Sequence, residues 1–262
     1  TLHTVYKKIG ESQSFDLYEN PRALKTGYMV SDSVLDYAME GTDPLEVQNR
    51  LLSGIVGKRL YKMQMVSSEA AWAGTVDFDI SLKKGQHGYL YIPGTEPETV
   101  TINGQEQKSD YWNNNFLDLG IYNVDTIVQV TTGTGMHEAV LGTYQESELD
   151  SIYEELSSQQ MDLKDGKGSI SVKKDGILML SVFYDPDMKV YVDGEKADVS
   201  KVEVKGEQLL IKLKSAQTSS AVSEKTKTWS ISFAETPYYE VQIWNQAGLP
   251  LKPFHKEVNL AE

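Results

Sequence analysis

The chain of 262 residues contains no cysteine, which excludes disulfides, thiol nucleophiles and thiolate metal sites together. It has no apolar run near the roughly 18 residues that suggest a membrane-spanning helix, and no signal-peptide pattern at its start. Thr1 is not an initiating methionine, so we expect a further segment of the same protein to precede it.

Positive charge is scarce, because 25 Lys and Arg residues face 38 Asp and Glu residues and the formal net charge is −13. This imbalance opposes the counterion release that drives nucleic-acid binding, so nucleic acid is excluded as a partner. It also opposes attraction to an anionic lipid surface, so any membrane association should depend on a covalently attached segment. With 40% hydrophobic and 24% charged residues, the composition is that of a folded globular protein.

Alternation of apolar and polar residues is the main pattern that is present, and it is typical of antiparallel strands with one buried face. It is clearest in four segments: Val76-Phe78-Ile80-Leu82, Leu209-Ile211-Leu213, Trp229-Ile231-Phe233 and Tyr239-Val241-Ile243. The pairs Asn103-Gly104 and Asp193-Gly194 predict tight two-residue hairpins. The predicted fold is mainly β, with antiparallel, jelly-roll-like β-sandwiches and a few short helices.

Two short helices are expected among the strands. Asp43 has the character of an N-cap and is followed by Pro44, which together with apolar residues at helical spacing predicts a helix near residues 44–54. Ser147, with Asp150 three residues later, predicts the start of a second helix with one apolar stripe. We expect this second helix to connect two β domains.

An internal repeat supports the division into two domains. When the chain is aligned with itself at an offset of 90 (170 minus 80), turn and apolar positions coincide without a gap, including Ile80 with Ile170 and Asn103-Gly104 with Asp193-Gly194. We therefore predict a first β-sandwich domain over residues 1–158 and a second, repeat-related one over residues 159–262.

Few side chains are arranged as a reactive centre would require. The four histidines stand singly without metal-ligand spacing, so we expect surface positions for His3, His87, His137 and His255. A glycosidase needs two carboxylates about 5 to 10 Å apart; Asp185 and Asp187 could form such a pair, but around Pro186 a tight turn is the favoured interpretation. We predict no catalytic residue, no metal and no cofactor.

One segment suggests ligand binding. In the segment from Tyr111 to Phe116, aromatic residues stand beside a run of asparagines, and aromatic rings stack on sugar faces while amides exchange hydrogen bonds with hydroxyls. Tyr111, Trp112 and Asn114 are therefore candidate sugar ligands. The alternative is a β-turn whose aromatic side chains fill one end of a sandwich.

Three motifs, in order along the chain, resemble those of one family. These are Leu17-Tyr18-Glu19-Asn20-Pro21-Arg22-Ala23-Leu24 with Gly27-Tyr28-Met29-Val30, then Glu46-Val47-Gln48-Asn49 with Leu51-Leu52, and then Val182-Phe183-Tyr184-Asp185 with Lys189-Val190-Tyr191-Val192-Asp193-Gly194. Together they resemble the region that follows the transmembrane part of YfhO-type bacterial membrane proteins, over roughly residues 4–213.

The resemblance implies a role and a location. YfhO-type proteins are polytopic membrane proteins of Gram-positive bacteria that resemble lipid-linked glycosyltransferases and are implicated in decorating envelope polymers such as lipoteichoic acid. The chain is then expected to be a non-catalytic extracellular accessory domain at the cell membrane. Its partners would be the transmembrane part of the same polypeptide and an envelope glycopolymer. Alternatives are an independent carbohydrate-binding module and a secreted glycoside hydrolase.

Overall fold

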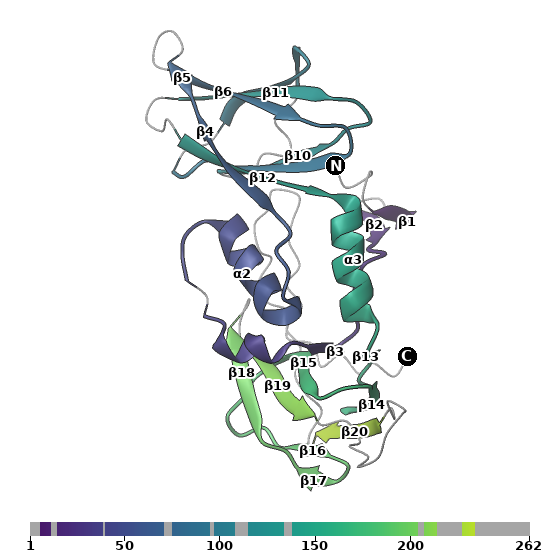
Figure 1. The fold of residues 1–262 in the computed structure, drawn as a ribbon. Helices are drawn as coiled ribbons and strands as arrows, with labels where there is room; N and C mark the ends of the chain where they lie inside the picture. The colour runs from purple at the N-terminus through teal and green to yellow at the C-terminus, as the bar shows by residue number, and fades with distance from the viewer. Residues whose placement is uncertain are drawn as a thin grey trace, which may run out of the picture. The chain divides into compact units, whose positions relative to one another are not determined.

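The computed structural model describes residues 6–11, 15–38, 40–70, 75–94, 97–107, 115–133, 138–203, 207–213 and 227–233. Strands dominate these residues and all their pairings are antiparallel, which confirms the predicted mainly β, sandwich-rich fold (Figure 1). The chain divides into two compact units. Unit 1 comprises Thr1–Ala23, Gly41–Asn49 and Arg59–Ser151, and unit 2 comprises Leu24–Glu40, Arg50–Lys58 and Ile152–Glu262. That residues 1–158 and 159–262 each fold as a domain stays a prediction.

Two of the sheets formed by the described residues of unit 1 enclose one core. The first has the order β10-β7-β12-β4 and the second the order β5-β6-β11-β8-β9. Their bounds are β4 Lys62–Ser67, β5 Glu69–Ala70, β6 Thr75–Leu82, β7 Gln86–Tyr91, β8 Pro97–Ile102, β9 Gln105–Glu106, β10 Phe116–Ile121, β11 Thr126–Gly133 and β12 Glu138–Gln145. The alternating residues Val76, Phe78, Ile80 and Leu82 of β6 are all buried in this core, as the period-two pattern predicts. A separate hairpin pairs β1 (Lys7–Glu11) with β2 (Asp16–Glu19).

The described residues of unit 2 also form two sheets, of order β13-β3-β15-β19-β18 and β14-β20-β16-β17. Their bounds are β3 Gly27–Val30, β13 Gln160–Met161, β14 Lys167–Val172, β15 Gly176–Phe183, β16 Val190–Val192, β17 Glu195–Lys196, β18 Val199–Glu203, β19 Glu207–Leu213 and β20 Lys227–Phe233. Ile211, Leu213, Ile231 and Phe233 enter its core, as their alternation predicts. The predicted strand at Tyr239-Val241-Ile243 lies outside the described residues.

The repeat at an offset of 90 is visible in the strands. It places β6 on β14, β7 on β15, β8 on β16 and β9 on β17. Both predicted hairpin turns have left-handed backbones, with φ of 48° at Asn103 and 51° at Asp193. Each of these two side chains accepts a backbone N–H from the next strand of its sheet, Asn103 from Ile127 at 2.9 Å and Asp193 from Ser230 at 2.8 Å. One supersecondary unit therefore occurs twice.

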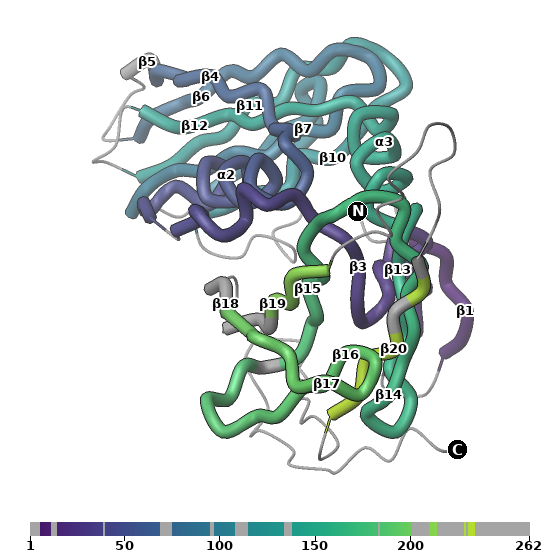
Figure 2. The backbone as a smooth tube through the Cα atoms, turned by 60° about the horizontal axis from the view of Figure 1, so that its bottom comes forward, coloured from purple at the N-terminus to yellow at the C-terminus, as the bar shows by residue number. Residues whose placement is uncertain are grey.

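One strand of each repeat comes from an unexpected part of the chain. In unit 1, β12 lies between β7 and β4, whereas in unit 2 the corresponding place between β15 and β13 is taken by β3 (Figure 2). The strand β3 belongs to the N-terminal part of the chain and precedes the first helix, while β12 precedes the second helix. The strand β3 therefore precedes α2 and the first repeat, but it pairs with β15 of the second repeat. The strand β12 precedes α3 and the second repeat, but it pairs with β7 of the first repeat.

The first predicted helix is confirmed as α2, Pro44–Val56, with a short 3-10 helix η1 (Asp32–Asp36) before it. The carboxylate of Asp43 accepts the N–H of Leu45 at 2.9 Å, which confirms the N-cap. At the other end Gly57, with φ of 69°, donates its N–H to the carbonyl of Ser53 at 3.0 Å. The glycine explains why the helix stops there.

The second helix, α3, runs over Glu146–Ser157 and begins one residue before the predicted Ser147. The reason is a different N-terminal contact from the one predicted. Glu148, not Asp150, reaches back and accepts the N–H of Gln145 at 2.8 Å. The strand β12 therefore passes directly into the helix without a loop.

Candidate functional site

The three candidate sugar ligands Tyr111, Trp112 and Asn114 fall within residues 108–114, outside the described residues. Their role as ligands stays a prediction. The described chain ends on one side of this segment with β9 and Gln107, and resumes on the other with Asn115 and β10.

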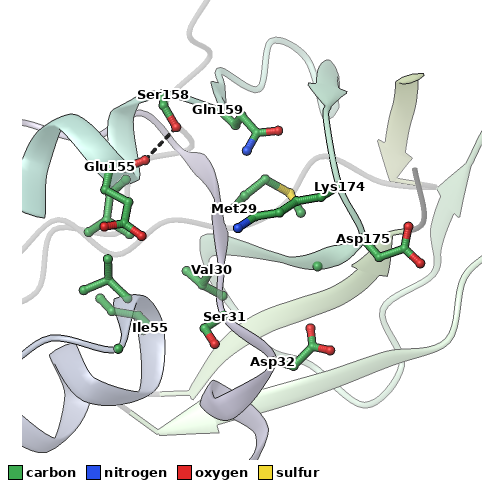
Figure 3. A pocket seen from close by; sticks show the side chains of 14 residues that line it. Met29, Val30, Ser31, Asp32, Ile55, Glu155, Ser158, Gln159, Lys174 and Asp175 are labelled. Carbon is green, nitrogen blue, oxygen red and sulfur yellow. Dashed lines mark hydrogen bonds between the residues drawn. The ribbon is translucent and has the colours of Figure 1, made fainter. Parts of the chain in front are cut away.

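Unit 2 contains a cavity of about 500 Å³ that no sequence motif indicated (Figure 3). Four separate segments build it: the end of β3 with the start of η1, the last turn of α2, the last turn of α3, and the turn between β14 and β15. Its lining residues are Met29, Val30, Ser31, Asp32, Ile55, Val56, Gly57, Glu155, Leu156, Ser158, Gln159, Lys174, Asp175 and Gly176.

Two backbone hydrogen bonds hold the walls of the cavity together. The N–H of Met29 donates to the carbonyl of Gln159 at 3.0 Å, which fastens β3 to the segment after α3. The N–H of Ser31 donates to the carbonyl of Ile55 at 2.8 Å, which fastens the end of β3 to α2. These bonds tie three of the four segments into one frame, so the cavity is part of the packed fold of unit 2.

The floor of the cavity is apolar and its rim is polar. Val30, Ile55, Val56 and Leu156 are buried, with 5 to 8% of their surface exposed. The polar rim residues are exposed except the half-buried Gln159; they are Ser31, Asp32, Glu155, Ser158, Gln159, Lys174 and Asp175. Seven of the fourteen lining residues are polar, so the cavity offers more hydrogen-bonding groups than the predominantly apolar lining that is usual for a small-molecule site.

Some of the rim side chains are already held by other groups. Glu155 forms an ion pair with Lys58 at 2.8 Å, and its backbone carbonyl accepts the hydroxyl of Ser158 at 2.7 Å. The amide oxygen of Gln159 accepts the N–H of Lys173 at 2.9 Å. The side chains of Asp32 and Lys174 form no hydrogen bond or ion pair within the part of the chain that the structure describes. Asp32 and Lys174 are therefore available to a ligand.

A second polar cluster lies in unit 1 around His87, and it corrects the expectation that this histidine is on the surface. His87 is 1% exposed, and its Nε2 lies 2.8 Å from the carboxylate of Asp118. Its Nδ1 lies 3.0 Å from the hydroxyl of Tyr144 and 3.4 Å from the carboxylate of Glu146. The partners come from β10, β12 and α3, distant in sequence, and they satisfy both ring nitrogens of a buried side chain.

Tyrosines surround this histidine and stay protonated. His87 stacks on Tyr89 with a centroid distance of 4.7 Å, and Tyr61 packs edge-on against Tyr89. Burial, with the carboxylate of Asp118 nearby, raises the pKa of Tyr61 to about 12 and raises the pKa of Tyr89 further. The phenols therefore act as hydrogen-bonding and stacking groups, and the cluster serves to hold β7, β10 and β12 together.

The segment that contains Asp185 and Asp187 forms the predicted tight turn. The N–H of Asp187 donates to the carboxylate of Asp185 at 2.8 Å, and the N–H of Met188 donates to the carbonyl of Asp185 at 3.0 Å. Asp185 is thus engaged locally in a β-turn. Among the described residues, no three His, Asp or Glu side chains are grouped as a metal site.

Neither helix of the described chain combines the length and the apolar character needed to cross a bilayer. Comparison with protein families matches the family described as bacterial membrane protein YfhO, over residues 2–219. No curated protein matches the chain.

Among solved structures, the chain is similar to a Paenibacillus sp. cycloisomaltooligosaccharide glucanotransferase complexed with cycloisomaltoheptaose. The identity is 6%, the TM-score is 0.18, and the match covers 66% of this chain and 44% of that one, less than half its length. So low a TM-score supports no conclusion about fold or function. The family match extends over most of the sequence and includes all three motifs, from Leu17 to Gly194. The chain belongs to the YfhO family of bacterial membrane proteins.

Proposed function

We propose that this chain is the extracellular, non-catalytic accessory part of a polytopic, glycosyltransferase-like membrane protein, in which it recognises and orients a cell-envelope polymer such as lipoteichoic acid for glycosylation. The observation that carries the proposal is the polar-rimmed cavity of unit 2 in a chain that belongs to a membrane-protein family. Such a cavity suits recognition of a small group.

The charge of the chain supports a position away from the inner face of the membrane. A formal charge of −13 is repelled by the anionic cytoplasmic leaflet, whereas domains on that side are often held by basic residues. The attachment to the bilayer would come from the transmembrane part of the same polypeptide, which is the expected partner. An envelope glycopolymer would be the second partner.

Direct tests distinguish the proposed accessory function from two alternatives, an independent carbohydrate-binding module and a secreted glycoside hydrolase. An independent carbohydrate-binding module would be encoded behind a signal peptide alone, whereas the proposal requires several hydrophobic spans in the same gene. A secreted glycoside hydrolase acting through Asp185 would lose its activity in Asp185→Asn. The local hydrogen bonds of Asp185 favour the turn over the hydrolase.

Location is testable because the chain has no cysteine. Single cysteines are placed in the complete protein at Val124, which is 62% exposed in unit 1, and at Lys196, which is exposed in unit 2. Labelling of intact cells with a membrane-impermeant maleimide is expected at both positions.

Two controls accompany the labelling. Val130→Cys, at a buried position, should label only after denaturation, and the 262-residue part of the unsubstituted protein should not label at all. Labelling at Val124→Cys and Lys196→Cys only in permeabilised cells would place the chain on the cytoplasmic side and refute the proposal.

The sugar-binding role proposed for Tyr111, Trp112 and Asn114 has its own test. Addition of an N-acetylated glycan or of polyglycerol phosphate is expected to change tryptophan fluorescence in the unsubstituted chain and not in Trp112→Phe. Absence of a response to either polymer at about millimolar concentration, where binding free energy is only about −4 kcal/mol, would reject this role.

A further inference from the structure

We propose that the cavity of unit 2 binds an uncharged sugar ring, so that the chain recognises the sugar substituents of a polymer and not its phosphate backbone. The inference deepens the proposed function and rests on it only for the natural source of the sugar. The binding chemistry itself follows from the lining of the cavity.

The charges around the cavity disfavour an anionic ligand. Three lining carboxylates, those of Asp32, Glu155 and Asp175, face one lining ammonium group, that of Lys174. Lys58 forms an ion pair with Glu155 from outside the lining, so that even with Lys58 included three carboxylates face two ammonium groups. A phosphate group brought to this rim would meet more negative than positive side chains.

The two helices add to the negative potential. Both α2 and α3 line the cavity with their last turns, and the C-terminal end of a helix carries partial negative charge. Neither helix has a basic side chain in its last turn. A neutral ligand that donates hydrogen bonds is therefore preferred to an anion.

The rim offers both kinds of hydrogen-bonding group that a sugar needs. A hydroxyl group donates one hydrogen bond and accepts others, so a ring with several hydroxyls suits a site that presents donors and acceptors together. Asp32 supplies a carboxylate acceptor, and Lys174 supplies an ammonium donor. In Figure 3 the amide nitrogen of Gln159 is drawn on the side of Met29 and Lys174, while its oxygen is held by the N–H of Lys173.

The floor matches the less polar surface of such a ring. The C–H groups of a pyranose form an apolar face, which gains free energy when it covers aliphatic side chains. Val30 and Ile55 are buried, whereas Met29 is half-buried, so Met29 supplies most of the aliphatic surface that a ring could still cover. The volume of about 500 Å³ lies within the roughly 300 to 1,000 Å³ of small-molecule sites.

The test is titration of the 262-residue chain with small probes, followed by ligand-observed NMR. The neutral probes are methyl glucoside, methyl galactoside and methyl N-acetylglucosaminide; glycerol 3-phosphate is the anionic probe and ethanolamine the cationic probe. At least one glycoside is expected to bind with millimolar affinity, while glycerol 3-phosphate and ethanolamine do not compete.

Matched variants locate the binding to the cavity. Asp32→Asn replaces a charged acceptor with a weaker neutral one, and Lys174→Met removes a charged donor. We expect each change to weaken binding about tenfold or more. The controls are Asp36→Asn, at the other end of the same 3-10 helix, and Lys173→Met, whose exposed side chain does not line the cavity. These controls are expected to change the affinity by less than about twofold, with thermal melting confirming that all four variants fold.

Each outcome decides the inference. Failure of every glycoside to bind at about 10 mM overturns it, as does equal weakening by the variants and their controls. Binding of glycerol 3-phosphate that is lost in Lys174→Met would assign the cavity to an anion, and binding of ethanolamine that is lost in Asp32→Asn would assign it to an amine. Cysteine labelling decides the proposed function separately, because that result does not depend on whether the cavity binds a sugar.

Discussion

Asn49 offers the sharpest test of how this fold is held together. It is fully buried on α2, where it accepts the N–H groups of Leu60 and Tyr61, both at 2.9 Å, and donates to the carbonyl of Tyr61 at 3.0 Å. One side chain thus satisfies three backbone groups of the segment that leads from the helix into β4.

The magnitude follows from these three contacts. Asn49→Ala leaves two N–H groups and one carbonyl without their partner, and each buried orphan costs about 1 to 3 kcal/mol. Since Tyr61 is only half-buried, water can reach part of this site, so we expect a total loss near 4 kcal/mol. That is a large share of the roughly 5 to 15 kcal/mol by which folded proteins are stable.

The assay is urea denaturation followed by far-ultraviolet circular dichroism, with the midpoint compared at constant m value. Gln48→Ala is the matched control, since Gln48 is the preceding residue of the helix and forms one exposed hydrogen bond with the hydroxyl of Tyr61. The control should lose less than about 1 kcal/mol. Asn49→Asp should lose at least as much as Asn49→Ala, because it places a carboxylate in a fully buried site and turns its second oxygen toward the carbonyl of Tyr61.

A loss below about 1 kcal/mol in Asn49→Ala, equal to that of Gln48→Ala, would refute this reasoning. It would mean that the backbone of residues 60 and 61 finds other partners, and that the asparagine of the family motif is not needed for stability. A loss of several kcal/mol in both variants would instead indicate that α2 as a whole is marginal.

Three further predictions follow from other contacts. His87→Ala removes a buried ring with three polar contacts and a stacked tyrosine, and should lower the free energy of unfolding by about 2 to 4 kcal/mol in chemical denaturation; an unchanged midpoint would contradict it. Gly168→Ala should cost about 1 to 3 kcal/mol, because its Cβ would lie 2.6 Å from the backbone oxygen of Asp162, while Gly10→Ala, whose nearest contact is 3.9 Å, should be near neutral. Hydrogen bonds from the backbone N–H of Gln145 and then from Lys62 lower the pKa of Glu148, so the ionised carboxylate stabilises the fold at neutral pH and this stabilisation is lost as the pH falls below about 4.5. Glu148→Gln should flatten that part of a profile of stability against pH, and an unaltered profile would contradict the prediction.

Local patterns could be predicted because their causes lie close together in the sequence. The alternation of β6 places its apolar residues on one face whatever the partner strand is, and the capping of α2 by Asp43 needs only the residues beside it. The hairpins at Asn103-Gly104 and Asp193-Gly194 depend on left-handed backbones that these residue types adopt easily. The helix, strand and turn predictions at these positions are confirmed for that reason.

The burial of His87 could not be predicted in the same way. A single histidine in a strand has no local feature that separates a surface position from a buried one. Its position is decided by Asp118 on β10, Tyr144 at the end of β12 and Glu146 at the start of α3, which are 31 to 59 residues away. The helix α3 begins one residue before the predicted Ser147, because the carboxylate of Glu148 accepts the N–H of Gln145 and so places the N-cap at Gln145.

The sequence by itself determined the β class, the two helices and the tight turns, since each follows from residues within one strand, helix or turn. The repeat follows from aligning the sequence with itself at an offset of 90 (170 minus 80). Tertiary structure alone decided that β3 pairs with β15 and β13, because strand pairing depends on which edges are free in the packed sheet. It likewise created the cavity of unit 2, whose four walls come from separate segments. The first family motif contributes Met29 and Val30 to the lining, and by themselves these two residues do not indicate a cavity.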